Sequence, residues 1–306
     1  MLAGRCPYFP FEDADFRQAV GARPLRPGEG IIEVDSAYRA DLALKEALLA
    51  EDREYCFQAL PGTGPAQWEA LQLVLGDLAR SRPDAVSLSE GPGDWRWENR
   101  LLGTGATFRP GYDATLPLPP LEWVGRQVQE DLLLVDARDE SLPLVAGLLC
   151  FPSGWSLGEK IGRSLASIHE PVPGFAPVAR PGALLLQRLR AGRPVVRYNW
   201  TFKATGELDL SPRRHWPAGE DVTPRDAGER LWLRVERQTL ARLPKSDAVL
   251  FTVRTCLTRV GEAAGDGQRA ARMLRALRTA PPELLEYKGM GGFTGALIAY
   301  LAERAA

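Results

Sequence analysis

Two short apolar runs in residues 131–151 predict a β-hairpin. The runs are DLLLVDA and LPLVAGLLCF, and the polar link RDES joins them. Apolar runs of this length between turn-forming residues are typical of buried strands. Three further stretches, at 193–204, 231–243 and 248–260, are rich in Val, Thr, Phe, Tyr and Trp and often alternate with polar residues, as strands do. The middle stretch is also compatible with a helix at RQTLARL, and the link PKSD is short enough for a hairpin.

A helix is predicted between these two groups of strands. Ser156 and Glu159 form the S-x-x-E pattern of a capping box, which places the start of the helix at Ser156. His169 lies in the last predicted turn, because the sequence EPVPG that follows it ends the helix. One buried stripe is marked by residues at spacings of four, four and three: Leu157, Ile161, Leu165 and Ile168.

The order of these elements predicts an α+β fold with an antiparallel sheet, built from two strands, helices and three strands, with helical N- and C-terminal extensions. We divide the chain into an N-terminal extension (1–125), a core (126–262) and a C-terminal helical extension (263–306). The first part combines predicted helices at Ala40–Ala50 and Gln67–Arg80 with loops such as SEGPGDWRWENR. A turn and a last helix at Phe293–Arg304 close the third part, after a helix that includes MLRALRTA.

Composition indicates an ordinary cytoplasmic protein. Hydrophobic residues make up 45% of the 306 positions and the formal charge is -1, so the chain has material for a large core and no basic excess. We therefore expect no nucleic-acid partner and no membrane partner. The N-terminal sequence resembles no secretion signal, and no apolar run is long enough to span a bilayer. The four scattered cysteines are interpreted as reduced core thiols.

The small number of histidines limits the kinds of metal site that this chain can form. The chain has two histidines, and its cysteines stand far apart without a CxxC motif, which argues against a tetrahedral zinc site. Heme iron requires only one axial ligand from the protein. His169 therefore has two interpretations: an axial heme ligand, or a histidine that caps the last carbonyls of its helix. His215 lies in a polar, Pro-containing loop and is a weak candidate for a ligand.

Small residues precede His169 on the predicted helix. At 100° per residue, Gly158, Gly162 and Ala166 fall on the same side of the helix as His169. Such a flank would let a flat macrocycle approach, or would let a strand pack closely; the sequence leaves both open.

Several segments resemble a family that includes the heme-dependent oxidative N-demethylases. The similarity covers most of residues 120–290 and is weaker before them, where CPYFPF, ARPL and VDSAYRADLALKEALL match. The strongest matching segments are GLLCFPSGWSLGEKIGRSLASIHEPVPGF, VERQTLARLPKSDAVLFTVRT, VQEDLLLV and EYKG. The resemblance implies a PAS-like fold that binds heme b, with His169 as the axial ligand of the iron.

The resemblance also implies an activity and its partners. A monooxygenase of this kind takes electrons from NAD(P)H through flavin and iron–sulfur partner subunits. It activates O2 and removes a methyl group as formaldehyde from a small methylated amine such as dimethylamine. No dinucleotide-binding motif and no iron–sulfur cysteine cluster occurs in the chain, so we expect those cofactors in partner chains.

Charged residues within the predicted strands are candidates for the catalytic side of such a site. Arginines in strands usually face solvent, but heme propionates need cationic partners and bound dioxygen needs donors. Arg237 and Arg254 are the candidates for these roles, and Glu236 is the candidate for proton transfer or for attracting a cationic amine. The sequence does not tell which strand face points inward.

Other residues are weaker candidates for the cofactor site. We expect Lys160 near a propionate and Trp155 and Asn199 in the pocket lining, although a solvated lysine and a core tryptophan are the ordinary alternatives. The segment EYKGMGGFTG lacks the spacing of a phosphate-binding loop and is interpreted as a turn before a helix. Besides the enzyme, two functions stay open: a PAS-like heme sensor of gas or redox state, and a binding protein without heme.

Overall fold

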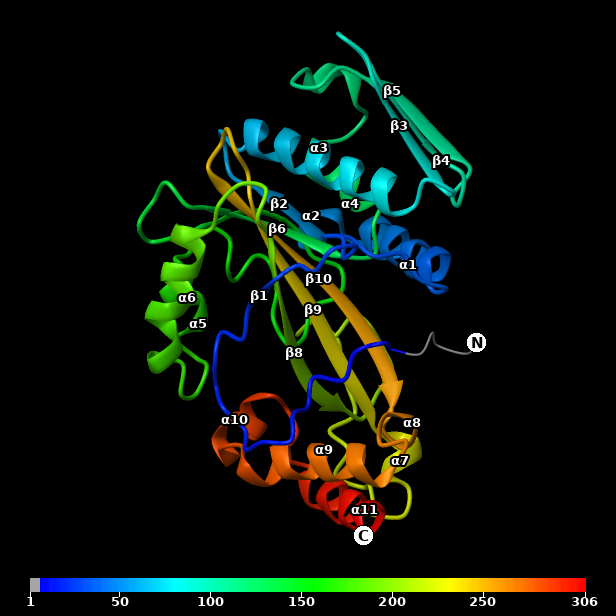
Figure 1. Ribbon diagram of the computed structural model, residues 1–306, viewed down its shortest axis with the longest axis vertical. Helices are drawn as coiled ribbons and strands as arrows, with labels where there is room; N and C mark the ends of the chain where they lie inside the picture. The colour runs from blue at the N-terminus through cyan, green and yellow to red at the C-terminus, as the bar shows by residue number, and fades with distance from the viewer. Residues whose placement is uncertain (1–5) are drawn as a thin grey trace.

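A seven-stranded antiparallel sheet forms the centre of the molecule. The computed structural model describes residues 6–306, and its sheet has the strand order β1-β8-β9-β10-β6-β7-β2 (Figure 1). The sheet strands are β1 (Arg23–Pro24), β2 (Phe57–Ala59), β6 (Asp131–Asp136), β7 (Leu144–Leu148), β8 (Val195–Lys203), β9 (Trp232–Arg242) and β10 (Ala248–Arg259).

The predicted strands are confirmed. The runs at 131–151 form the β6–β7 hairpin, and the stretch at 231–243 is a strand rather than a helix. Strands β9 and β10 form a hairpin whose turn contains Asp247 at φ 62°, where the short side chain is tolerated. Strand β10 then pairs with β6, which joins the two groups of strands into one sheet.

The N-terminal third contributes two edge strands to this sheet, which the sequence pattern did not reveal. Strand β1 pairs with β8 and strand β2 pairs with β7. Both are only two or three residues long, too short for a two-residue alternation to show. They are strands because their backbone completes the hydrogen bonding of the sheet edges.

Helices from the N-terminal part cover one half of one sheet face. Helix α3 contributes fully buried Leu71, Val74 and Leu75, which pack with Leu132 of β6 and Leu250 of β10 in one core. The predicted helices at 40–50 and 67–80 are confirmed with slightly wider bounds. The helices of this part are α1 (Tyr38–Glu51), α2 (Arg53–Cys56), α3 (Gly64–Ser81), η1 (Asp113–Thr115) and α4 (Pro120–Gly125).

A second sheet replaces the loop predicted at SEGPGDWRWENR. It lies on the far side of α3 from the main sheet (Figure 1). Trp97 is buried while its neighbours Arg96 and Glu98 are exposed, which is the alternation of a strand with one covered face. The sequence GPG before Trp95 is typical of a loop, so this short alternation was not recognised as a strand. The strands are β3 (Val86–Glu90), β4 (Trp95–Asn99) and β5 (Thr104–Phe108).

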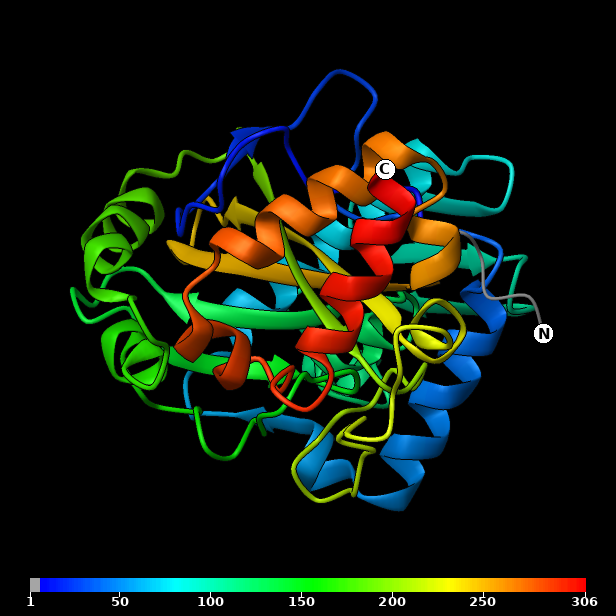
Figure 2. The ribbon, with the colours of Figure 1, turned by 90° about the horizontal axis from the view of Figure 1, so that it is seen from below.

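C-terminal helices cover the other end of the same main-sheet face. Figure 2, a view from below, shows α9 and α11 side by side in front of the sheet. Met273 of α9 and Leu297 of α11 pack with Phe202 of β8 and Val235 of β9. The predicted last helix at 293–304 is confirmed. The helices are α7 (Ala227–Arg230), α8 (Val260–Ala263), α9 (Gly267–Thr279), α10 (Pro282–Tyr287) and α11 (Thr294–Ala305).

The helix predicted to begin at Ser156 is wrong in its start. Residues 158–162 form turns, and Gly162 has φ 76°, which a right-handed helix does not allow. Only half of the capping box forms: the Ser156 N–H donates to the Glu159 carboxylate at 3.0 Å. The helix is α5 (Leu165–His169), and the Ser164 side chain caps it. A further helix, α6 (Ala176–Arg188), follows it.

Among the residues that the structure describes, no helix has both the length and the apolar character needed to cross a membrane.

Candidate functional site

Strands β8 and β9 carry a row of polar side chains on the sheet face opposite to α1, α3 and α4. Residues two apart share a face, and Arg197 pairs with Gln238 while Asn199 pairs with Glu236. All four side chains are half-buried. Because a sheet face inside a protein is usually apolar, this row marks a place for polar chemistry.

Both ends of this face are covered by other parts of the chain, and the polar row lies between the two covered ends. At one end, Leu165 of α5, Leu185 of α6 and Val195 of β8 pack against the same apolar cluster. At the other end, the fully buried Arg234 donates from Nη2 to the Phe151 carbonyl at 2.6 Å and from Nη1 to the Leu208 carbonyl at 3.0 Å. The polar row therefore lies between the His169 helix and the loops around residues 151 and 208.

His169 is held at the end of α5 with one ring nitrogen engaged. Its Nδ1 lies 2.9 Å from the Leu165 carbonyl oxygen, which fixes Nδ1 as the protonated nitrogen. The ring stacks on Phe175 with 4.5 Å between centroids and 14° between planes. Nε2 has no hydrogen-bond partner among the described residues. A histidine whose Nδ1–H donates to a carbonyl and whose Nε2 is free has the geometry of a metal ligand.

The surroundings of His169 favour its neutral form. Burial lowers the pKa of His169, and the positive charges of Lys160 and Arg197 lower it further. A neutral imidazole is the form that binds metals. Lys160, in the turn before α5, and Arg197 of β8 are therefore two cations whose charge acts on His169.

Lys160 and Trp155 lie together beside the polar row. The Lys160 ammonium is 4.0 Å from the centroid of the Trp155 ring, a cation–π contact. Burial lowers the pKa of Lys160 to about 8, although the charges of Glu159 and Glu236 act in the opposite direction. The structure thus brings Lys160, Trp155, Glu236 and His169 to one region.

Glu236 is the centre of a hydrogen-bond network. Its Oε2 accepts from Gln238 Nε2 at 2.9 Å and from Asn199 Nδ2 at 3.3 Å, and its Oε1 lies 3.7 Å from Arg234 Nε. Lys288 continues the network, because its Nζ donates to Asn199 Oδ1 at 3.2 Å and to the Trp200 carbonyl at 2.5 Å. Three strand residues and one distant lysine therefore hold this carboxylate in place.

Cations outnumber anions around this carboxylate. Lys203 donates to the Lys288 carbonyl at 2.6 Å, and burial lowers the pKa of both lysines to about 8. Burial also lowers the pKa of Arg197, whose buried Nε has no hydrogen-bond partner among the described residues. Burying cations without matching anions is unfavourable. The region is therefore built to receive negative charge from a ligand.

Arg237 and Arg254 lie on the opposite sheet face from Glu236. Arg237 donates to the carbonyls of Gly30 at 2.6 Å and Ile31 at 3.1 Å. Arg254 forms ion pairs with Asp35 at 2.5 Å and with Asp41 at 3.2 Å. Both arginines thus hold the segment at residues 30–41 against the sheet, and the structure does not bring them together with Glu236 or His169.

Gly162 does not lie on the His169 helix as predicted, and His215 lies in an exposed loop. Gly162 lies in an exposed turn and its N–H donates to the Leu144 carbonyl at 2.7 Å. Because Gly158 and Gly162 precede the start of α5, the small-residue flank expected on a helix around His169 is wrong. His215 is exposed in the loop after Asp209.

Sequence reasoning missed several members of the site. Arg197 and Asn199 are two apart in a predicted strand, so the alternation in RPVVRYNW contained the signal for Arg197. Lys203 and Lys288 had no such signal, since Lys288 lies 89 positions from its partner Asn199. Phe175 follows the segment that was expected only to end a helix.

The residues present fit a heme. A heme needs one axial nitrogen and cationic partners for two propionates. His169 Nε2 is a free nitrogen that could hold the iron, and Lys160 and Arg197 are cations whose charge acts on His169. A comparison with known proteins agrees with this fit: the family model "Haem-dependent oxidative N-demethylase, alpha subunit-like" matches residues 22–298.

Proposed function

Because the chain belongs to the family of heme-dependent oxidative N-demethylase alpha subunit-like proteins, we propose that it is the heme-binding subunit of a monooxygenase for small methylated amines. The bound cofactor in this proposal is heme b, which supplies the activation of dioxygen. Dimethylamine is the proposed substrate, and formaldehyde is a proposed product. The strand order of the core supports a PAS-like description of the fold.

One observation carries the proposal: His169 presents a free Nε2 while Leu165 holds its Nδ1. The carbonyl acceptor fixes the tautomer, and the Phe175 stack fixes the orientation of the ring. In this proposal His169 is the axial ligand of the iron. Its lowered pKa keeps the nitrogen available for the metal at neutral pH.

The cationic side chains have the role of holding the propionates. Lys160 and Arg197 are the proposed partners, because both lie close to His169 and both are buried at a cost in charge solvation. A propionate beside each side chain would stabilise its positive charge and offset the effect of burial. Trp155 and Asn199 complete the wall of the proposed site.

Glu236 is the proposed binding group for the amine. A secondary amine is protonated at neutral pH, and a carboxylate held by Asn199 and Gln238 is a fixed partner for an ammonium group. Lys288, bonded to Asn199, keeps the amide oriented toward Glu236. Arg237 and Arg254 have structural roles in this proposal, because their donors are used by the segment at residues 30–41.

Partner subunits complete the proposed reaction. The electrons come from NAD(P)H through flavin and iron–sulfur proteins, which agrees with the alpha-subunit description of the family. The free thiols of the four cysteines support a cytoplasmic location.

The test is an absorption spectrum of protein purified from heme-replete cells. We expect a Soret band in the wild type and its loss or shift in His169→Ala. His215→Ala is the matched control, since it removes the other histidine, and it should leave the band unchanged. A wild type without a Soret band would contradict the proposal.

Turnover separates the enzyme from a heme sensor. With a reducing system, oxygen and dimethylamine, the enzyme releases formaldehyde, and Glu236→Gln should raise KM for the amine. Binding of O2 or CO without turnover of any small methylated amine would favour the sensor and contradict the enzymatic proposal.

A further inference from the structure

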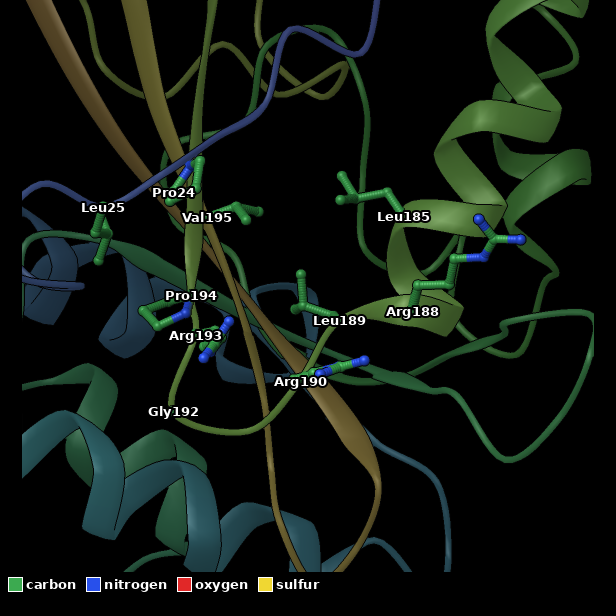
Figure 3. A pocket seen from close by; sticks show the side chains of 10 residues that line it. All are labelled: Pro24, Leu25, Leu185, Arg188, Leu189, Arg190, Gly192, Arg193, Pro194 and Val195. Atoms are coloured by element: carbon green, nitrogen blue, oxygen red, sulfur yellow. The ribbon is translucent and has the colours of Figure 1, made fainter.

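A pocket of about 440 Å³ lies between the end of α6 and strands β1 and β8 (Figure 3). Its apolar walls include Leu25, Leu185, Leu189 and Val195. The chain around it is held by a turn, in which the Arg193 N–H donates to the Arg190 carbonyl at 3.1 Å, and by the Leu25 N–H, which donates to the Pro194 carbonyl at 3.3 Å. The pocket therefore has a shape set by backbone hydrogen bonds.

Three arginines surround this apolar pocket. Arg188, Arg190 and Arg193 line it and are exposed, and no acidic residue lines it. Among the described residues, none of the three takes part in an ion pair within 4.0 Å. Most other arginines around the molecule have carboxylate partners, for example Arg23 with Glu29 at 2.7 Å. This pocket therefore combines an apolar floor with three arginines that have no carboxylate partner among the described residues.

The floor of the pocket is continuous with the packing of the His169 helix. Leu185, Leu189 and Val195 belong to one apolar cluster with Leu165 of α5. The carbonyl of Leu165 is the group that holds His169 Nδ1 at 2.9 Å. A protein bound in the pocket would therefore contact the apolar cluster against which Leu165 of the His169 helix packs.

We propose that this pocket, lined by Arg188, Arg190 and Arg193, is the docking site for an acidic electron-donating partner protein. An apolar side chain of the partner fills the space above Leu185 and Leu189, and carboxylates around that side chain pair with the arginines. Arginine beside an apolar anchor pocket is a typical composition of protein interfaces. The inference rests on the proposed function, because that function requires an electron donor close to the metal site.

Charge complementarity identifies the occupant. The whole chain is close to neutral, with a formal charge of -1, so three arginines without an acidic neighbour in the pocket lining are a local positive excess that attracts an acidic partner. Such a pattern orients the encounter of two proteins and increases the association rate at low salt. Orientation matters here, since the arginines line a pocket whose floor belongs to the apolar cluster that Leu165 of the His169 helix packs against.

The experiment uses an acidic plant-type [2Fe–2S] ferredoxin as the probe. Binding to the full chain is measured by calorimetry, with and without heme, at low and at physiological ionic strength. The variant is the triple substitution Arg188→Glu, Arg190→Glu and Arg193→Glu. The control is Arg39→Glu, Arg96→Glu and Arg278→Glu, which reverses three exposed arginines on other elements.

We expect the pocket variant to bind the ferredoxin at least about tenfold more weakly, since three exposed charge pairs together account for roughly that factor. The control variant should bind like the wild type, and salt should weaken wild-type binding. In the heme-loaded protein, stopped-flow reduction by ferredoxin should slow in the pocket variant, whereas reduction by dithionite should not change.

Equal binding by the pocket variant and the control would overturn the docking site, and so would a wild type that does not bind the ferredoxin. Both results are independent of the Soret band. A wild type that shows no Soret band yet binds the ferredoxin through the arginines would contradict the proposed function and leave the docking surface in place.

Discussion

Lys45 is a fully buried lysine, and its replacement by methionine provides a quantitative test of how the core is held together. Its ammonium donates to the carbonyls of Gly125, at 3.3 Å, and Val128, at 3.0 Å, and to that of Glu130. It also lies 3.8 Å from the carboxylate of Asp131, which is equally buried. These contacts join α1 to the chain that leads into β6.

The expected cost of Lys45→Met is about 3–5 kcal/mol in the free energy of unfolding. Removing one partner of a buried ion pair costs about that much, because the other charge loses its compensation. Asp131 retains two donors, the N–H groups of Cys150 and Phe151, both at 2.9 Å. Burial already raises the pKa of Asp131, so loss of the lysine should drive this carboxyl toward its neutral form.

Urea denaturation at pH 7, followed by circular dichroism, measures this cost. The matched control is Lys245→Met at an exposed position, for which a change within about 0.5 kcal/mol is expected. In the Asp131→Asn background, Lys45→Met should cost at least about 1 kcal/mol less than in the wild type. A cost for Lys45→Met below about 1 kcal/mol, or fully additive costs in the double variant, would refute the reasoning.

Three further predictions address pH dependence and the two sheet faces. Burial raises the pKa of Glu130 from 4.5 to about 7, so the folded state retains a proton that the unfolded state loses. The contribution of this group to the free energy of unfolding is therefore fully present below about pH 4.5 and is lost as the pH rises to 7. Glu130→Gln should remove about 3 kcal/mol of the pH dependence of the unfolding free energy, measured by denaturation curves between pH 4.5 and 8. The pKa of Lys160, a proposed propionate partner, is lowered to about 8, so heme affinity, measured by absorbance titration, should fall above pH 8 in the wild type and less steeply in Lys160→Met; equal pH profiles would contradict this. Arg237→Gln should lower stability by roughly 2–4 kcal/mol, since buried carbonyls lose their donor, and leave the Soret maximum unchanged; a shifted maximum would place Arg237 at the cofactor.

Local patterns were sufficient for much of the fold and for the central histidine. The β6–β7 and β9–β10 hairpins, α1, α3 and α11 were predicted because periodicity within one segment reports which positions are buried. His169 was identified by its rarity and by the family resemblance, and its place in the last turn of a helix is confirmed. The start of that helix was not predictable, because the S-x-x-E pattern at Ser156 does not distinguish a helix start from a turn. In the structure the Ser156 N–H donates to the Glu159 carboxylate within a turn.

The sequence by itself determined five of the seven strands of the main sheet, helices α1, α3, α9 and α11, the family and the candidate ligand, since each of these depends on neighbouring residues or on an ordered set of motifs. Only the tertiary structure decided which sheet face carries the candidate site. Glu236 and Arg237 are adjacent in β9, yet opposite faces of the pleat separate them. The structure also brings Lys288 to Asn199 and joins β1 and β2 to the sheet edges. Contacts between distant segments depend on packing of the whole chain, and no local period encodes them.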